Sequence, residues 1–73
     1  MLKEVTLREI EAIFAVTDAL GISRESLVIP LAPRRPGRVR RMPDGRIEIV
    51  VDAERDFAEF VAGLEGELRA LAD

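Results

Sequence analysis

Hydrophobic residues recur at helical spacing near the N-terminus, between residues 7 and 20. The apolar positions on this side are Leu7, Ile10, Ile13, Phe14 and Leu20. Thr6 and Glu9 form a T-x-x-E capping box just ahead of them, in which each side chain accepts a hydrogen bond from the other residue's backbone N–H. Gly21 follows at the position where a left-handed glycine commonly ends a helix. The pattern therefore predicts a helix over residues 7–20.

A second apolar stripe recurs at spacings of three and four near the C-terminus, which is typical of one face of an amphipathic helix. Its members are Phe57, Phe60, Val61, Leu64, Leu68 and Leu71. Asp52 has the side chain of an N-cap, and Glu54 and Asp56 would lie favourably near the positive end of the helix dipole. We therefore expect the second helix to start at Asp52 and to continue through the stripe.

The stretch after the first helix predicts one short strand and a loop. Residues 27–31 are apolar, with two β-branched side chains, which favours a strand. Pro30 has no N–H to donate, so this segment is either a strand at a sheet edge or an extended segment that does not pair with the sheet. Residues 32–37 contain two prolines and a glycine and predict a loop. The sequence leaves open whether residues 27–31 form a true strand.

Residues 39–51 predict a β-hairpin, with strands at 39–42 and 46–51. Its loop is Pro-Asp-Gly at residues 43–45, which fits a type I turn followed by a left-handed glycine. Apolar and polar residues alternate along the return strand, so one face is apolar and the other mostly polar. The apolar face consists of Ile47, Ile49 and Val51. The other face consists of Arg46, Glu48 and Val50.

The order of elements is α-β-β-β-α, or α-β-β-α if residues 27–31 are not a strand. We expect a two-layer α+β fold in which a small antiparallel sheet of two or three strands carries the N-terminal and the C-terminal helix on one face. The length of 73 residues corresponds to a single domain, residues 1–73.

The composition limits how such a small fold is stabilised and where it comes from. Cysteine and histidine are absent, so disulfides, thiolate sites and the commonest zinc ligand are excluded. Self-association is the remaining way to enlarge the core, and we therefore expect a homodimer or a higher oligomer. Asn and Gln are also absent and Arg outnumbers Lys by ten to one, which is typical of a thermophilic or GC-rich bacterium.

The most unusual feature of the charge pattern is a basic stretch at residues 34–46, with a net charge of +5. Its six arginines are Arg34, Arg35, Arg38, Arg40, Arg41 and Arg46. Residues 52–73 have a net charge of −5, so the arginines could pair with acids of the second helix, in the same subunit or across a dimer. They could instead bind nucleic acid, whose phosphates match guanidinium forks, or an acidic protein. The basic stretch contains no aromatic residue on which single-stranded bases could stack.

Two glycines inside the predicted C-terminal helix are a further candidate feature, because each costs about 1 kcal/mol relative to alanine. Gly63 and Gly66 form a small-residue patch with Ala70, on the flank and back of the helix. Small residues allow a second helix to approach closely. We interpret the patch as a candidate self-association contact, the alternatives being glycines that are merely tolerated or a helix broken near Gly63.

Enzymatic chemistry finds little support in the sequence. Without histidine or cysteine, no nucleophile–base set can be assembled, and the carboxylates do not have the spacing of a metal-binding loop. We therefore expect no catalytic residue, no metal and no cofactor. The N-terminal residues also lack the apolar run of a signal peptide, which favours a cytoplasmic location without membrane insertion.

The order of elements resembles two enzyme families, but the chain lacks the histidines that each family uses. The helix–hairpin–helix order, with P-D-G-R at residues 43–46, resembles small toxin ribonucleases of the HicA type. These enzymes use a strand histidine that this chain lacks. Residues 45–52 leading into a helix resemble the strand–helix unit of minimal zinc peptidases, whose helix carries H-E-x-x-H, whereas residues 63–67 are G-L-E-G-E. Neither activity is therefore implied. The sequence favours a self-associating interaction or structural module, with nucleic-acid or other polyanion binding by the arginine hairpin as the alternative.

Overall fold

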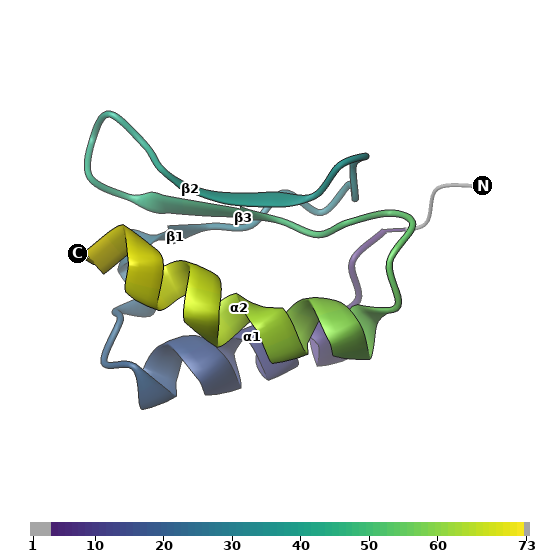
Figure 1. Cartoon of the computed structure of the whole chain (residues 1–73), viewed down its shortest axis with the longest axis horizontal. Helices are drawn as coiled ribbons and strands as arrows, with labels where there is room; N and C mark the ends of the chain where they lie inside the picture. Colours follow the sequence, from purple (N-terminus) through teal and green to yellow (C-terminus); the bar gives the residue numbers. More distant parts are fainter. Residues whose placement is uncertain (1–3, 73) are drawn as a thin grey trace.

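Two helices pack side by side against one face of a three-stranded sheet (Figure 1). The computed structural model describes residues 4–72. Its elements are α1 (Leu7–Ala19), a short 3-10 helix (Arg24–Ser26), β1 (Leu27–Val28), β2 (Arg38–Arg41), β3 (Ile47–Val50) and α2 (Phe57–Ala72). The predicted two-layer α+β fold is thus confirmed.

The sheet is mixed, and the prediction of a purely antiparallel sheet was wrong. The strand order is β1-β3-β2, with β2 antiparallel and β1 parallel to β3. The hairpin occupies one side of β3, so β1 can join only on the other side, and the chain then crosses the end of β3 to reach β2. Residues 27–31 do contribute a strand at a sheet edge, but only Leu27 and Val28 pair with β3.

The hairpin loop has the predicted geometry. Gly45 has a φ of 90° and donates its N–H to the carbonyl oxygen of Met42 at 2.9 Å. The N–H of Met42 donates in turn to the carbonyl oxygen of Arg46 at 2.6 Å. The Asp44 carboxylate accepts from the backbone N–H of Arg46 at 3.0 Å and from its guanidinium at 2.9 Å. The loop therefore holds β2 and β3 in register from its own residues.

Both ends of α1 also match the sequence prediction. Thr6 N–H donates to a Glu9 carboxylate oxygen at 2.9 Å, and Glu9 N–H donates to the Thr6 hydroxyl oxygen at 3.2 Å, which completes the capping box. Gly21 follows with a φ of 76°, and the N–H of Ile22 donates to the Thr17 carbonyl oxygen at 2.9 Å. The helix is therefore closed at both ends by local hydrogen bonds.

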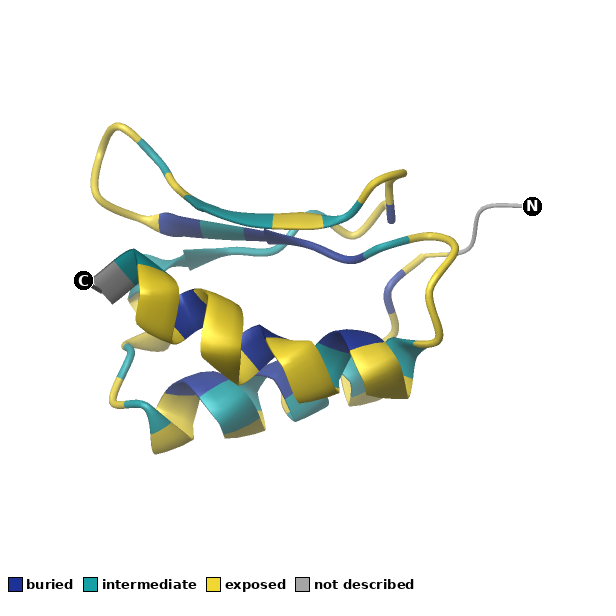
Figure 2. Cartoon of the chain, in the orientation of Figure 1, coloured by how far each residue is buried: buried dark blue, intermediate teal, exposed yellow. Residues whose placement is uncertain are grey.

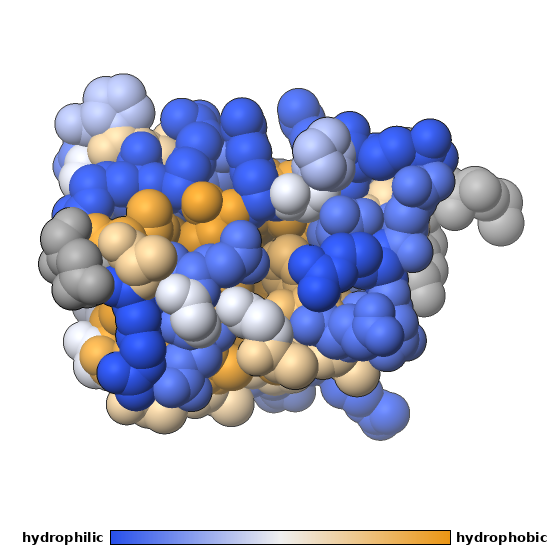
Figure 3. Space-filling view, viewed as in Figure 1, coloured by the Kyte–Doolittle hydropathy of each residue, from blue (hydrophilic) through white to orange (hydrophobic). Residues whose placement is uncertain are grey.

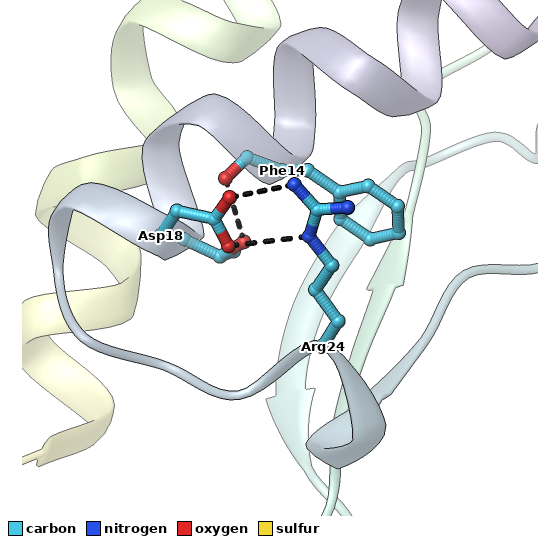
Figure 4. Close-up of polar contacts among 4 residues, drawn as sticks. Phe14, Asp18 and Arg24 are labelled. Atoms are coloured by element: carbon cyan, nitrogen blue, oxygen red, sulfur yellow. Dashed lines mark hydrogen bonds and ion pairs between the residues drawn. The ribbon is translucent and has the colours of Figure 1, made fainter.

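Arg24 ties the 3-10 helix back to the last turns of α1 (Figure 4). Its guanidinium donates to both oxygens of Asp18, at 3.3 and 2.7 Å, and lies 4.5 Å from the centre of the Phe14 ring. The hydrogen bond and positive charge of Arg24 lower the pKa of Asp18. Bidentate pairing combined with ring stacking is specific to arginine, so lysine could not replace it.

The start of α2 differs from the prediction, because the helix begins at Phe57 rather than after Asp52. One oxygen of Asp52 does accept from the N–H groups of Glu54 and Arg55, at 2.8 and 3.2 Å, as an N-cap would. The backbone of Asp52, however, also forms a parallel bridge with Arg34. It therefore remains extended as a continuation of β3, and the turn that it caps does not propagate into the helix.

The core lies between the two layers, where buried residues of β3 face those of the helices (Figure 2). The fully buried hydrophobic side chains are Ile13, Ile49 and Leu64, one from each of α1, β3 and α2. Val50 is only 3% exposed although it points to the opposite face of the sheet. The loop between β1 and β2, with the buried Pro33, passes over that end of the sheet.

This loop crosses β3 in close contact with Asp52. Arg34 bonds to the strand on one side, donating to Val51 O at 3.0 Å and accepting from Ala53 N–H at 2.9 Å. Gly37 then donates its N–H to the second carboxylate oxygen of Asp52 at 3.1 Å. Hydrogen bonds from the N–H groups of Glu54 and Gly37 lower the pKa of Asp52. One carboxylate therefore joins the loop to the turn before α2.

Replacing Gly37 by alanine should destabilise the fold by about 1–3 kcal/mol, the usual cost of overpacking. The added Cβ would lie 2.5 Å from the backbone nitrogen of Asp52 and 2.6 Å from its Cα, and backbone atoms cannot rotate away. Gly66→Ala is the matched control, because its Cβ would meet nothing within 4 Å, and it should stabilise the helix by up to about 1 kcal/mol. Urea unfolding of the parent and both variants measures the change in the free energy of unfolding. A Gly37→Ala protein as stable as the parent would contradict the close crossing.

Candidate functional site

The arginines of β2 divide between the two faces of the sheet. Arg38 and Arg40 are opposite Val50 and Glu48 in the β2–β3 ladder, so they point away from the helices. Arg41 is opposite Ile47 and therefore points to the helix side. There its guanidinium donates to the carbonyl oxygen of Leu71 at 2.8 Å, near the negative end of α2.

Glu48 is the main acidic partner on the outer face of the sheet. Its carboxylate is 2.7 Å from the Arg40 guanidinium and 3.8 Å from that of Arg38, and its side chain is 15% exposed. The hydrogen bond from Arg40 lowers the pKa of Glu48 most, and the positive charges of Arg40, Arg38 and Arg34 lower it further. Three guanidinium groups thus stabilise the ionised form of the Glu48 carboxylate.

Two further arginines form ion pairs with acids outside the helices. Arg35 forms an ion pair with Glu54, in the turn that precedes α2, and Arg46 pairs with Asp44 in its own loop. Among residues 4–72, no ion pair joins one of the six arginines to an acid within α2. The six arginines therefore have three carboxylates as ion-pair partners in this subunit, which leaves an excess of positive charge.

Most of these arginines remain accessible to solvent. The side chains of Arg35 and Arg38 are 72% and 60% exposed, and that of Arg40 is 41% exposed. We call the outer surface formed by Arg34, Arg35, Arg38 and Arg40 the arginine face. The ion pair of Arg35 with Glu54 is exposed on both sides and contributes only about 0–1 kcal/mol, so an anionic ligand can displace Glu54.

The helix layer has the opposite charge. Each helix carries three acidic residues and one arginine. The acids of α1 are Glu9, Glu11 and Asp18, and those of α2 are Glu59, Glu65 and Glu67. The charge separation along the sequence thus becomes a separation between two layers, with the basic sheet on one side and the acidic helices on the other.

Apolar surface is exposed between these layers along the side formed by β2 and α2 (Figure 3). Val39 of β2 and Leu71 of α2 are only partly buried and border the core there. The opposite flank of α2 faces α1 across a hollow of about 190 Å³, which is lined by Leu20, Ile22, Leu68 and Arg69. Helical phase then places Gly63, Glu67 and Ala70 on the flank towards β2. We call Val39, Leu71, Gly63 and Ala70 the seam.

The small-residue patch predicted from the sequence is exposed, and no contact among residues 4–72 explains its glycines. Gly63, Gly66 and Ala70 all lie on the surface of α2, although Gly66 points further from the sheet than the other two. A Cβ at Gly63 or Gly66 would meet nothing within 4 Å, and neither glycine has a positive φ. Helix interruption near Gly63 is also excluded, because α2 is continuous through it.

Within residues 4–72, no group of three or more acidic side chains is placed to hold a metal ion. In the same range, neither helix is long and apolar enough to cross a membrane. Comparison with protein-family models, curated proteins and solved structures found no match to this chain.

The Glu48 carboxyl should titrate below the ordinary value of about 4.3 when followed by NMR. Arg40→Gln should raise its pKa most, because the hydrogen bond from Arg40 is the largest cause of the shift. Arg69→Gln, which removes an exposed arginine of α2 paired with Glu65, is the control and should leave the pKa unchanged.

The sign of the effect on stability is set by linkage. A carboxyl whose pKa is lowered in the folded state stabilises the fold above its unfolded pKa, and this stabilisation is lost as pH falls through the folded pKa. The stability difference between the parent and Glu48→Gln should therefore be present at neutral pH and should shrink below about pH 4. A Glu48 pKa at or above its ordinary value would contradict the pairing with Arg40.

Proposed function

We propose that this protein is a non-enzymatic interaction module that forms a homodimer through the side between β2 and α2. The observation that carries the proposal is the order of surface types on this side. The basic sheet comes first, the apolar seam lies in the middle and the acidic α2 follows. A surface with this order is complementary to itself when it is turned by a two-fold axis, as an isologous dimer contact requires.

The direction of the axis follows from the charges. An axis along the seam, parallel to β2, places the sheet of one subunit against α2 of the other and brings the two seams together. Arg41, on the helix side of β2, then faces the partner's acidic helix. An axis perpendicular to the layers would instead set β2 beside the partner's β2, arginine against arginine, which like-charge repulsion disfavours.

The seam also gives the helix glycines a role. A glycine at residue 63 leaves the apolar surface beside it uncovered, at a cost of about 1 kcal/mol in helix propensity. Close approach of a second subunit offsets this cost by burying Val39 and Leu71 more completely. The gain matters for a chain of 73 residues without cysteine, because such small cores provide little stability on their own.

Gly63→Gln should convert the dimer into a folded monomer. The longer side chain meets nothing within 4 Å of its Cβ in one subunit, so folding is preserved, but it fills the seam against the partner. Ala58→Gln is the matched control, an equally exposed position on the other flank of α2. Sedimentation or light scattering at micromolar concentration should report a dimer for the parent and the control. A monomeric parent, or equal loss of dimer in both variants, would overturn the proposal.

Charge reversal tests the pairing across the two-fold axis. Arg41→Glu and Glu67→Arg should each weaken the dimer, because each places like charges in contact. Their combination should restore much of the lost affinity, since the pair is then reversed rather than removed. The dissociation constant from sedimentation equilibrium provides the measurement. Losses that simply add in the double variant would show that these residues do not meet across the interface.

A further inference from the structure

The arginine face is not used by the proposed dimer, because it points away from both the helices and the seam. We propose that it binds the phosphate backbone of duplex nucleic acid. The face carries Arg34, Arg35, Arg38 and Arg40. Arg35 forms an ion pair with Glu54, and Arg38 and Arg40 form ion pairs with Glu48. Its excess of exposed guanidinium groups matches the geometry and charge of phosphate oxygens, and binding would release counterions from the backbone.

The chemistry of the face favours a phosphate backbone over an acidic protein. Stable protein interfaces have an apolar centre with buried anchors. The apolar residue of β3 on this face is Val50, which is only 3% exposed and therefore offers no anchor. A row of phosphates needs no apolar contact, since charge pairing and counterion release provide the affinity. Exposed arginines around a small acidic centre meet that requirement.

The same residues favour a duplex over a single strand. Single-strand binding relies on aromatic side chains on which bases stack. The chain has three phenylalanines and no tyrosine or tryptophan, and all three phenylalanines belong to α1 and α2. Asn and Gln, which commonly read adenine, are absent from the chain. The face therefore lacks both the stacking side chains of single-strand binders and the amide side chains that commonly read adenine.

Glu48 sets the affinity of this site by competing with the ligand. Its carboxylate holds Arg40 tightly, at 2.7 Å, and Arg38 loosely, at 3.8 Å. A phosphate that binds these guanidinium groups must replace their ion pairs with Glu48. The negative charge of Glu48 also repels the phosphate. Removing the charge of Glu48 should therefore strengthen binding, whereas removing an arginine that contacts the ligand should weaken it.

The test is fluorescence anisotropy with a short labelled duplex of mixed sequence and with one of its strands alone. The parent should bind the duplex at about 50 mM salt. A plot of the logarithm of the association constant against the logarithm of the salt concentration should have a slope of about −3, as expected for three or four phosphate contacts. Arg38→Gln and Arg40→Gln should each reduce this slope by about 1. Glu48→Gln should raise the affinity about fivefold, the effect of one nearby charge in water.

Arg69→Gln is the matched control. Its side chain is 65% exposed, close to the 60% of Arg38, but it lies on α2. It should leave both affinity and slope unchanged. The proposal is overturned if the duplex does not bind at about 50 mM salt, the regime in which electrostatic binding is strong. Tighter binding of the single strand, an equal loss in Arg69→Gln, weaker binding by Glu48→Gln, or binding of a poly-glutamate peptide in place of the duplex would also overturn it.

Discussion

The fold depends on how the chain crosses β3 between its two neighbouring strands. β1 and β2 are consecutive in sequence but lie on opposite sides of β3, so the connecting loop must pass over the end of that strand. The crossing is possible because Gly37 has no side chain where it meets the backbone of Asp52. The Asp52 carboxylate then fixes the loop with one oxygen and the turn before α2 with the other. Strand order, the position of the arginines and the entry into α2 all depend on this contact.

Local sequence patterns correctly predicted those parts of the fold that interactions between neighbouring residues determine. The capping box of α1, the left-handed Gly45 of the hairpin and the apolar stripe of α2 each depend on residues within a few positions of one another. The parallel pairing of β1 and the late start of α2 do not. Asp52 has the chemistry of an N-cap and does cap a turn, but its bridge to Arg34 is a long-range contact. No local pattern reveals such a contact, and it is what keeps the backbone extended there.

The candidate site could be predicted in composition but not in arrangement. The six arginines and the acidic C-terminal segment are evident in the sequence, and their equal and opposite charges favoured pairing with each other. The period of two along β2 directs Arg38 and Arg40 to the outer face, whereas the acids of α2 lie on the other layer. The arginines pair instead with Glu48, Asp44 and Glu54. The basic and acidic segments balance each other along the sequence, but the fold places them on different layers. The molecule therefore has both a basic face and an acidic one.

An exposed edge strand alone would explain some of these arginines, because charged side chains keep an edge from pairing with another sheet. Arg38 and Arg40 on β2 would satisfy that need. Arg34 and Arg35, however, lie in the crossing loop rather than on an open edge, and the positive charge of Arg34 acts on Glu48 of the outer face. Edge protection does not require charges there, nor does it require Glu48 to be shared between two guanidinium groups. A surface that gathers basic residues from a loop and a strand, with one acid among several arginines, has the composition of a binding surface for an extended anion.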